Sequence, residues 1–474
     1  MEQHVISRDS SPVRIAAFSA AGPGQMQSRI GDAARRLQST RSRESAVEAL
    51  FRNQCASFSP DDPFRIILVV PPGGDMSAML NQAAAITDES DPRSAGPSGD
   101  IPPGIFTGRG KPPGKAAFLF PGQGSQYVGM GNDVIRLFPA AGDAFELMEK
   151  TLEGDMPLSR MIFPENADCE TPDAGEKARM ESALRQTDIA QPAIGAVSLS
   201  MLKALAGFGM TPDAAAGHSF GELTALCAGN RLAEKDFCRL AVWRGRLMAA
   251  AGGSDSGQML AVKASPDEIA RIVQQSGLDV VVANKNSPEQ GVVSGRSDEI
   301  EKMLQLCKKN RVRAMVLPVS AAFHSPLVAS AAAGFYEKIA SVSMKPSAIP
   351  VYSNKTALPY PAETDDAMRL FGQHLSSPVN FMDMIQNMYS DGVRVFVEVG
   401  PKNALTGLVK TILRGDAPKN GNEFDAFSVD ASSGKQGGLY DLALSVARLA
   451  AAGYPVDPGA WPFDGSLHIK PAGL

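Results

Sequence analysis

The fold is decided by the stretch AAGHSFGEL, residues 215–223 of this 474-residue chain. It reads Gly-x-Ser-x-Gly between a small apolar run and the apolar-periodic residues 223–227, so we expect a strand to turn sharply into a helix with Ser219 at the apex. Gly217 and Gly221 suit such a turn, which needs unusual backbone angles and close strand-helix packing. The alternative for a lone Gly-x-Ser-x-Gly is a helix start that is merely punctuated by glycines. In the elbow interpretation, the helix N-terminus could stabilise an oxyanion as the hydroxyl attacks a carbonyl carbon.

Five histidines could supply the base that a serine hydroxyl needs at neutral pH. His4 and His468 lie near the termini. His218 adjoins the serine, so its side chain should point away from the apex, and His374 in GQHLSS is typical of a helix end or a packing position. Elimination therefore favours His324 as the base, against the alternative of a structural imidazole.

Composition excludes several classes of function. The net charge of -5 leaves no basic excess to neutralise phosphates, which argues against nucleic-acid binding. The chain has no run of about 18 apolar residues and no signal peptide at its start, so we expect a cytoplasmic protein without a membrane segment. Its cysteines show no metal-ligand spacing, which favours reduced thiols and no metal site. They are Cys55, Cys169, Cys227, Cys238 and Cys307.

The first part of the chain, residues 1–110, is predicted to be a small α/β domain, because strand and helix patterns alternate from Arg14 to Ile86. Thr87–Lys115 is rich in Pro, Gly, Asp and Ser, which is typical of a linker or a long strapping loop. A buried strand follows at Lys115–Phe120 and breaks at the turn PGQGSQ, residues 121–126. Because this turn lacks the Gly-Lys-Ser/Thr ending of a P-loop, we expect it to present backbone N–H groups to an anion or a carbonyl oxygen.

Residues 257–319 follow the order strand, helix, strand, strand, helix, strand, which predicts an inserted ferredoxin-like small subdomain. The flanking parts, 111–256 and 320–412, are predicted to form one large α/β subdomain with a parallel sheet, like that of α/β-hydrolases. From 413 to 474 the chain becomes polar and loop-like, apart from a helix at Gly437–Ala451.

Three elements of the large subdomain matter below. A helix over Gln191–Leu205, with Pro192 at its start, is expected to lead to the elbow strand. A strand is expected at Pro350–Ser353, and a final apolar strand at Arg394–Val399.

Six motifs occur in one order along the chain and together carry a family resemblance. They are FPGQGSQ (120–126), GHSFGE (217–222), WRGRLM (243–248), NxNSPxQ (284–290) with VVSG (292–295), AFHS (322–325) and EVGP (398–401). The chain resembles the malonyl-CoA:acyl carrier protein transacylase family, and more closely the acyltransferase domains of iterative polyketide and polyunsaturated fatty acid synthases. By the same likeness, residues 1–110 resemble the linker between ketosynthase and acyltransferase, and 413–474 the linker that follows the acyltransferase.

The resemblance implies a ping-pong reaction with no permanently bound cofactor. Ser219 would attack the thioester of malonyl-CoA, and His324 would take the proton. The backbone N–H groups of Gln123 and Phe220 would hold the oxyanion. The malonyl group would then pass to the phosphopantetheine thiol of an acyl carrier protein. In this family an amide or carbonyl near the Pro-Val-x-Phe motif holds the second imidazole nitrogen, and here the candidate is Asn380 in PVNF.

Substrate recognition is implied for four more residues. Arg244 matches the arginine that grips the free carboxylate of the malonyl group, a role that suits a planar and always charged fork. Its neighbour Arg246 fits a surface position. Phe323 before the histidine is typical of malonyl-selective domains, where a phenyl ring fills the space that an α-methyl group needs. His218 and Asn284 complete the expected substrate-binding set.

Two other functions remain open. A serine hydrolase that proofreads acyl thioesters could use the same dyad, since an arginine favours a carboxylated acyl group but does not exclude water. An idle docking module for neighbouring synthase domains is the third possibility, disfavoured by the intact set of Ser219, His324 and Arg244. The linker-like flanks suit a piece of a synthase, and the initial methionine suits an independent protein. The basic residues Lys308, Lys309, Arg311 and Arg313 could meet an acidic carrier protein or could simply be solvated helix-end charges.

Overall fold

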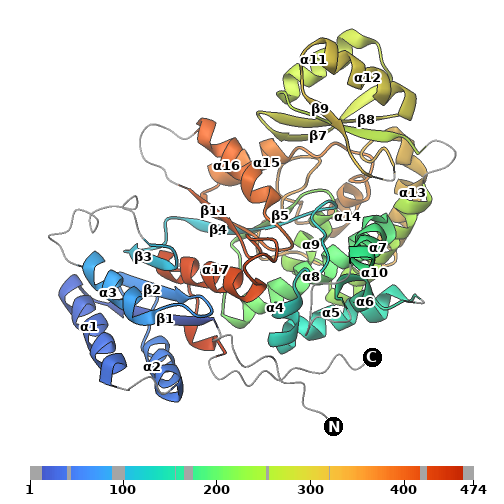
Figure 1. The fold of residues 1–474 in the computed structure, drawn as a ribbon. Coiled ribbons are helices and arrows are strands. Elements are labelled where there is room, and N and C mark those ends of the chain that lie inside the picture. Colours follow the sequence, from blue (N-terminus) through green and yellow to red (C-terminus); the bar gives the residue numbers. More distant parts are fainter. Residues whose placement is uncertain are drawn as a thin grey trace.

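The computed structural model describes residues 13–39, 44–87, 102–154, 156–164, 174–251, 256–319, 321–416 and 424–462. Its backbone forms an α/β fold built on three sheets, each with its own helices (Figure 1). The central sheet carries the Gly-x-Ser-x-Gly turn. The N-terminal sheet lies on one side of it and the inserted subdomain on another.

The central sheet is parallel, with strand order β11-β10-β4-β5. Its strands are β4 (Lys115–Phe120), β5 (Ala214–Gly217), β10 (Val393–Glu398) and β11 (Asp425–Ser428). The predicted strand at Pro350–Ser353 forms only isolated bridges. In one of them Val351 pairs with Ala215 of β5. A parallel sheet needs cover on both faces, which explains why β4 and β10 are almost continuously apolar.

Alternate residues of β4 face two different layers of helices. Ala116, Phe118 and Phe120 belong to the larger core, while Ala117 and Leu119 pack with α15 (Phe381–Ser390) and α16 (Ala404–Asp416). The other helices of this subdomain belong to the larger core or its rim. They are α4 (Asn132–Leu137), α5 (Pro139–Leu152), α6 (Leu158–Ile162), α7 (Ala174–Arg185), α8 (Thr187–Gly207), α9 (Gly221–Ala228), α10 (Glu234–Ala250), α13 (Ala329–Ala340) and α14 (Thr364–Gly372).

Helix α8 begins at Thr187, earlier than predicted, so Pro192 lies inside its early turns and not at its start. By length and composition α8 could cross a bilayer, but it is mostly buried within the fold, as the core helix of a globular protein is. Its apolar character follows from packing on α5 and α10.

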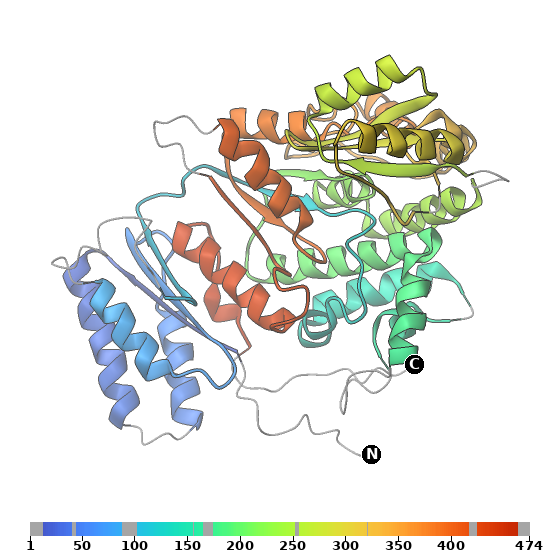
Figure 2. The same ribbon diagram turned by 45° about the horizontal axis from the view of Figure 1, so that its top comes forward.

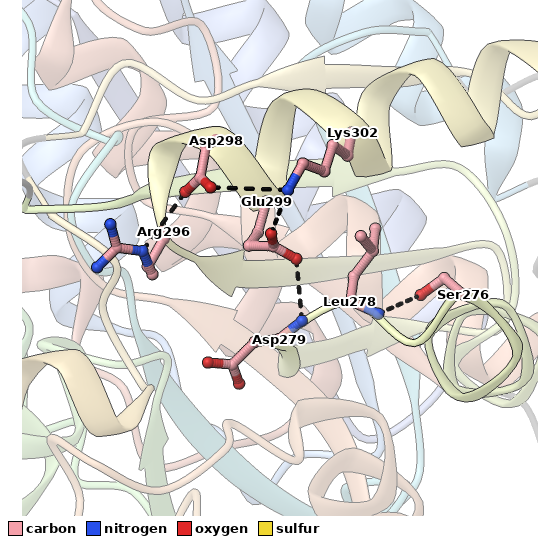
Figure 3. Close-up of polar contacts among 7 residues, drawn as sticks. All are labelled: Ser276, Leu278, Asp279, Arg296, Asp298, Glu299 and Lys302. Atoms are coloured by element: carbon pink, nitrogen blue, oxygen red, sulfur yellow. Dashed lines mark hydrogen bonds and ion pairs between the residues drawn. The ribbon is translucent and has the colours of Figure 1, made fainter.

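The inserted subdomain confirms the ferredoxin-like prediction. Its elements are β6 (Gln258–Val262), α11 (Pro266–Ser276), β7 (Val280–Ser287), β8 (Gln290–Gly295), α12 (Ser297–Lys309) and β9 (Ala314–Val316), in an antiparallel sheet of order β7-β8-β6-β9. Figure 3 shows how the first turn of α12 meets the start of β7. The Glu299 carboxylate accepts from the Asp279 N–H at 3.1 Å and pairs with Lys302 at 2.6 Å. β7 reaches the large subdomain through a backbone bridge between Asn284 and Val379.

The N-terminal unit is an antiparallel sheet of order β1-β2-β3 with three helices. Its elements are β1 (Arg14–Ala20), α1 (Pro23–Ser39), α2 (Glu44–Ala56), β2 (Phe64–Val70), α3 (Met76–Ile86) and β3 (Ile105–Arg109). β3 falls inside the predicted loop Thr87–Lys115 and pairs with β2. The prediction missed this strand because its neighbours are rich in Pro and Gly and it is only five residues long.

The predicted loop-like segment 413–474 is structured in its described part. The boundary at residue 412 falls inside α16, and β11 beyond it is the edge strand of the central sheet. Helix α17 (Gly438–Ala452) lies between the N-terminal and central sheets in both views (Figures 1 and 2). The buried Arg65 on β2 donates from Nε to the Ala451 carbonyl at 2.9 Å, and Gly108 is needed on β3 because a Cβ there would lie 1.6 Å from the same oxygen. The sequence pattern suggested that the N-terminal unit forms a domain of its own. In the structure α17, from the C-terminal part of the chain, packs against its sheet and completes its core.

Candidate active site

The predicted elbow is present, and its strain lies at the serine. β5 ends at Gly217 and α9 begins at Gly221, while Ser219 between them has φ of 51°. A non-glycine residue in this region costs free energy and persists where the surroundings impose it. The two glycines serve close packing and not unusual angles: a Cβ on Gly217 would lie 2.0 Å from the Gly221 carbonyl carbon, and one on Gly221 would lie 1.9 Å from the Phe120 oxygen.

Asn354 holds the strained turn and was missed by the sequence analysis. Its side chain donates to the Gly217 carbonyl at 2.6 Å and accepts from the Ser219 N–H at 2.7 Å. Its own N–H donates to the buried Glu222 carboxylate at 3.2 Å. Burial raises the pKa of Glu222 to about 7, and the Tyr360 hydroxyl donates to the same carboxylate oxygen. The sequence feature that could have indicated Asn354 is the polar pair Ser353-Asn354, which directly follows an apolar segment.

Ser219 and His324 meet as the sequence analysis expected. The Ser219 Oγ lies 2.8 Å from the His324 Nε2, and the imidazole is buried. The His324 Nδ1 lies 3.0 Å from the Ser377 carbonyl and 3.2 Å from the His374 carbonyl. Because carbonyl oxygens only accept, Nδ1 carries the proton and Nε2 is free to accept the serine proton.

The prediction that Asn380 orients His324 is wrong. The Asn380 side chain donates to the Lys355 carbonyl at 2.7 Å, whereas backbone carbonyls just before PVNF hold the imidazole. The motif thus marks the right segment but not the right atom. A carbonyl belongs to every residue, so residue type gave no signal.

Burial keeps the imidazole of His324 neutral. It lowers the pKa of His324 to about 3, with further contributions from the positive Arg244 and from His218. A neutral imidazole can act as a base without first losing a proton, which suits it to activate Ser219.

Arg244 on α10 is a fully buried cation beside the nucleophile. Its Nε donates to the His374 Nε2 at 3.1 Å, and its Nη2 lies 3.5 Å from the Ser219 Oγ. Within the described residues, no carboxylate lies within ion-pair distance of it. Burial lowers the pKa of Arg244, and the charge of Glu222 opposes that shift. A buried guanidinium without a counter-ion is well suited to bind an anion.

Arg246, two residues later on α10, is exposed, whereas Arg244 is buried. Its guanidinium donates to the Leu152 carbonyl and, at 3.1 Å, to the Glu153 carbonyl at the end of α5. This matches its expected surface position and makes it a control for Arg244.

His374 belongs to the site, although its sequence context is typical of a helix end. It follows α14, is buried, and stacks on Phe371 with ring centroids 4.6 Å apart. Its side chain accepts from Arg244 and its carbonyl accepts from His324. Nothing in the local sequence distinguishes this role from packing.

The Gly-rich turn lies against the elbow. A Cβ on Gly122 would lie 2.4 Å from the His218 carbonyl oxygen and 3.5 Å from the Phe220 nitrogen. In the described part of the chain, the backbone N–H groups of Gln123 and Phe220 have no backbone acceptor. The Gln123 side chain donates to Thr187 Oγ1 at 3.1 Å and so fixes the turn against α8. Two adjacent free donors next to Ser219 can hold an oxyanion.

The far end of the same turn is held by the C-terminal part of the chain. Lys402 Nζ donates to the Gly124 carbonyl at 2.9 Å. The Lys402 backbone has φ of 67°, and its N–H donates to the Asp430 carboxylate at 2.8 Å. Asp430 also accepts from the Tyr127 hydroxyl at 2.7 Å. The residues after β11 thus brace the turn that precedes α4.

Of the remaining predicted site residues, His218 and Phe323 adjoin the dyad in sequence, and Asn284 lies on β7. His218 Nε2 is 2.8 Å from Asn286 Oδ1, and its ring meets the edge of Phe381. Asn286 was not predicted. Asn284 is buried on β7 at the bridge to Val379, and Phe323 is buried in the larger core directly before His324.

Comparisons with known proteins agree with this geometry. Residues 117–423 match the acyl transferase domain family. The chain is 37% identical over 305 residues to the malonyl CoA-acyl carrier protein transacylase of Bacillus subtilis. This match covers 63% of this chain and 91% of that protein. It is 33% identical over 365 residues to the polyketide synthase GfsA of Streptomyces halstedii, covering 75% of this chain but only 5% of that synthase.

A solved structure extends the similarity to the flanks. The acyltransferase domain from the second module of the salinomycin polyketide synthase is 26% identical, with a TM-score of 0.68, and the match covers 94% of each chain. The N-terminal sheet and α17 therefore lie within the region that is similar to this domain.

Proposed function

The chain belongs to the acyl transferase domain family, and on that premise we propose that it moves a malonyl group from malonyl-CoA to the phosphopantetheine thiol of an acyl carrier protein. The observation that carries the proposal is the position of Arg244, a buried cation that has no ion-pair partner among the described residues. It lies 3.5 Å from a serine that is hydrogen-bonded to a neutral histidine. A malonyl group has a thioester carbon for the serine and a free carboxylate for the cation.

The first half-reaction loads the enzyme. Ser219 Oγ attacks the thioester carbon of malonyl-CoA, and its proton passes to His324 Nε2. The N–H groups of Gln123 and Phe220 stabilise the tetrahedral oxyanion. The intermediate collapses, the C–S bond breaks, and the CoA sulfur takes the proton from His324. The product is a malonyl ester on Ser219.

The second half-reaction reverses these steps with a different thiol. The phosphopantetheine thiol of the carrier protein gives its proton to His324 and attacks the malonyl ester, and Ser219 leaves with that proton. Water in place of the thiol would give the proofreading hydrolase. Transfer is favoured because the chain covers 91% of a transacylase at 37% identity.

Selection of the acyl group rests on Arg244 and Phe323. Arg244 would bind the malonyl carboxylate through its Nη groups. Phe323 would fill the space of an α-methyl group. His218 and Asn284 would line the pocket, and His218 is held for that role by Asn286.

We expect Phe323→Ser to raise turnover of methylmalonyl-CoA relative to malonyl-CoA by about fivefold to 150-fold, because a packed methyl group is worth about 1 to 3 kcal/mol of discrimination. The ratio of kcat/KM for the two thioesters measures the effect. Phe323→Leu keeps most of the bulk and serves as the matched control. An unchanged ratio in the serine variant would remove Phe323 from substrate selection.

The low pKa of His324 has a kinetic consequence. Because a protonated imidazole cannot accept the serine proton, the rate of Ser219 acylation should fall only when pH approaches the folded-state pKa of about 3. We expect single-turnover acylation by malonyl-CoA to stay level from about pH 8 to about pH 5, where an ordinary histidine would already be protonated.

Protein stability limits the range of that measurement. Below the ordinary histidine pKa the unfolded chain binds a proton that the folded His324 does not, so stability falls as pH falls. Circular dichroism at each pH identifies the range in which the protein stays folded. A loss of rate with a midpoint near pH 6.5 in folded protein would contradict the assignment of a buried neutral base.

Intact-protein mass spectrometry tests the function itself. The protein is incubated briefly with malonyl-CoA, methylmalonyl-CoA or acetyl-CoA, and then with a carrier protein that bears phosphopantetheine. We expect a malonyl adduct that persists and moves to the carrier. Continuous release of CoA without an adduct, even with carrier present, would favour the hydrolase, and inertness towards all three thioesters would favour a docking module.

We further propose that the flanks correspond to synthase linkers, the N-terminal unit to the one between ketosynthase and acyltransferase and the segment from residue 413 to the one after the acyltransferase. The similarity of the salinomycin domain over 94% of the chain supports this proposal. Neighbouring synthase domains such as a ketosynthase would then be partners besides the carrier protein, and the protein would act in the cytoplasm, alone or within a synthase.

A further inference from the structure

The hydrogen bonds of His374 define which of its nitrogens carries a proton. Nδ1 lies 3.0 Å from the Phe371 carbonyl, which can only accept, so Nδ1 is the donor. Nε2 is 3.1 Å from the Arg244 Nε, which can only donate, so Nε2 is the acceptor. Both nitrogens are used, and the imidazole is neutral.

The ring of His374 cannot easily turn. It stacks on Phe371 with an interplanar angle of 8° and meets the edge of Phe335 at 5.8 Å. The side chain is buried, and desolvation together with the nearby charge of Arg244 holds its pKa well below the ordinary value. A fixed ring presents its lone pair in one direction only.

That direction determines how Arg244 lies. With Nε bound to His374, the planar guanidinium directs its Nη2 towards Ser219, at 3.5 Å. An acidic residue could orient the arginine equally well, but its charge would cancel the attraction for a substrate carboxylate. A neutral acceptor orients the guanidinium and leaves its full charge available.

We propose that His374 is a positioning residue that gives the site its preference for carboxylated acyl groups, by holding Arg244 through a neutral hydrogen bond. This inference rests on the proposed malonyl transfer. The link of His374 to the dyad runs through its backbone carbonyl, so replacing the side chain should change Arg244 and leave His324 in place.

The test compares His374→Leu, which removes the acceptor at similar size, with His374→Gln, whose side-chain oxygen can still accept from Arg244. Two quantities are measured for each: kcat/KM with malonyl-CoA and with acetyl-CoA in the presence of carrier protein, and the rate at which phenylmethylsulfonyl fluoride modifies Ser219. The sulfonyl fluoride carries no carboxylate, so its rate of reaction reports on the reactivity of Ser219 and His324 and not on carboxylate binding by Arg244.

In His374→Leu we expect the malonyl-to-acetyl ratio to fall about tenfold, mainly through KM for malonyl-CoA, while sulfonylation changes less than about twofold. His374→Gln should recover most of the ratio. An unchanged ratio in His374→Leu would overturn the inference, and so would parallel losses of malonyl transfer, acetyl transfer and sulfonylation, which indicate a structural role. A wild-type protein that reacts with the sulfonyl fluoride but forms no malonyl adduct would overturn the proposed function and this inference together.

Discussion

Ser219→Ala is expected to abolish the malonyl adduct and to lower the rate of malonyl transfer by about 10⁵- to 10⁶-fold, the scale typical when a catalytic serine is removed. In the proposed mechanism the reaction passes through an ester on the Ser219 oxygen, which alanine lacks. The φ of 51° at Ser219 is compatible with alanine at similar cost, and the Asn354 bonds to the turn involve backbone atoms that alanine retains. The variant should therefore fold.

Adduct formation and CoA release are measured side by side with Ser341→Ala, which alters an exposed serine at the end of α13. The control should behave like wild type. A malonyl adduct of full yield on Ser219→Ala would place the nucleophile elsewhere and would remove the elbow from the mechanism.

Arg244→Ala is expected to erode the preference for malonyl-CoA over acetyl-CoA by about 1.5 to 3 kcal/mol, or roughly 10- to 150-fold in the ratio of kcat/KM. The reason is that the guanidinium is buried and has no acidic group within ion-pair distance among the described residues, so its charge is available to the substrate. Acetyl-CoA has no carboxylate and should lose little. The loss should therefore appear with one thioester and not with the other.

Arg246→Ala is the matched control, since Arg246 lies on the same helix but is exposed and bonded to carbonyls of α5. It should keep the wild-type ratio. The thermal unfolding midpoint of both variants, measured on the same preparations, checks that they fold. Unchanged discrimination in Arg244→Ala would remove this arginine from the substrate site.

The sequence predicted those parts of the site that depend on residue type. Ser219 could be found because an elbow needs small residues around the nucleophile, and His324 because few histidines compete for the role of base. The orienting groups were not predictable in the same way. The Ser377 and His374 carbonyls hold His324. Every residue has a backbone carbonyl, so the residue type does not indicate which one orients the histidine.

Asn354 and His374 were missed for a different reason. Each acts through contacts between segments far apart in the sequence, with Asn354 reaching the elbow and His374 reaching α10. Neither lies in a stretch whose spacing suggests chemistry. The Ser-Asn pair at 353–354 marks a polar position after an apolar segment, but the role of Asn354 or His374 becomes clear only when the fold brings its partners together.

For the fold, periodicity predicted long elements well and short ones poorly. The inserted subdomain has strongly patterned helices and strands, and its order was predicted correctly. β3 and β11 are short and follow polar or Pro-rich stretches, so local composition outweighed their apolar pattern. Both depend on pairing with a strand from another part of the chain, which local propensity does not encode.

The place of β11 at the edge of the central sheet has a practical consequence for excising or exchanging this domain. The family match ends at residue 423, just before β11 begins. A fragment cut there would leave β10, with the sequence VRVFVE, as an uncovered apolar edge, and such edges promote aggregation. It would also lack Asp430, the carboxylate that braces Lys402 and Tyr127 around the Gly-rich turn. Domain junctions are better placed beyond Trp461, whose indole N–H donates to the Val13 carbonyl and joins the last described residues to the first.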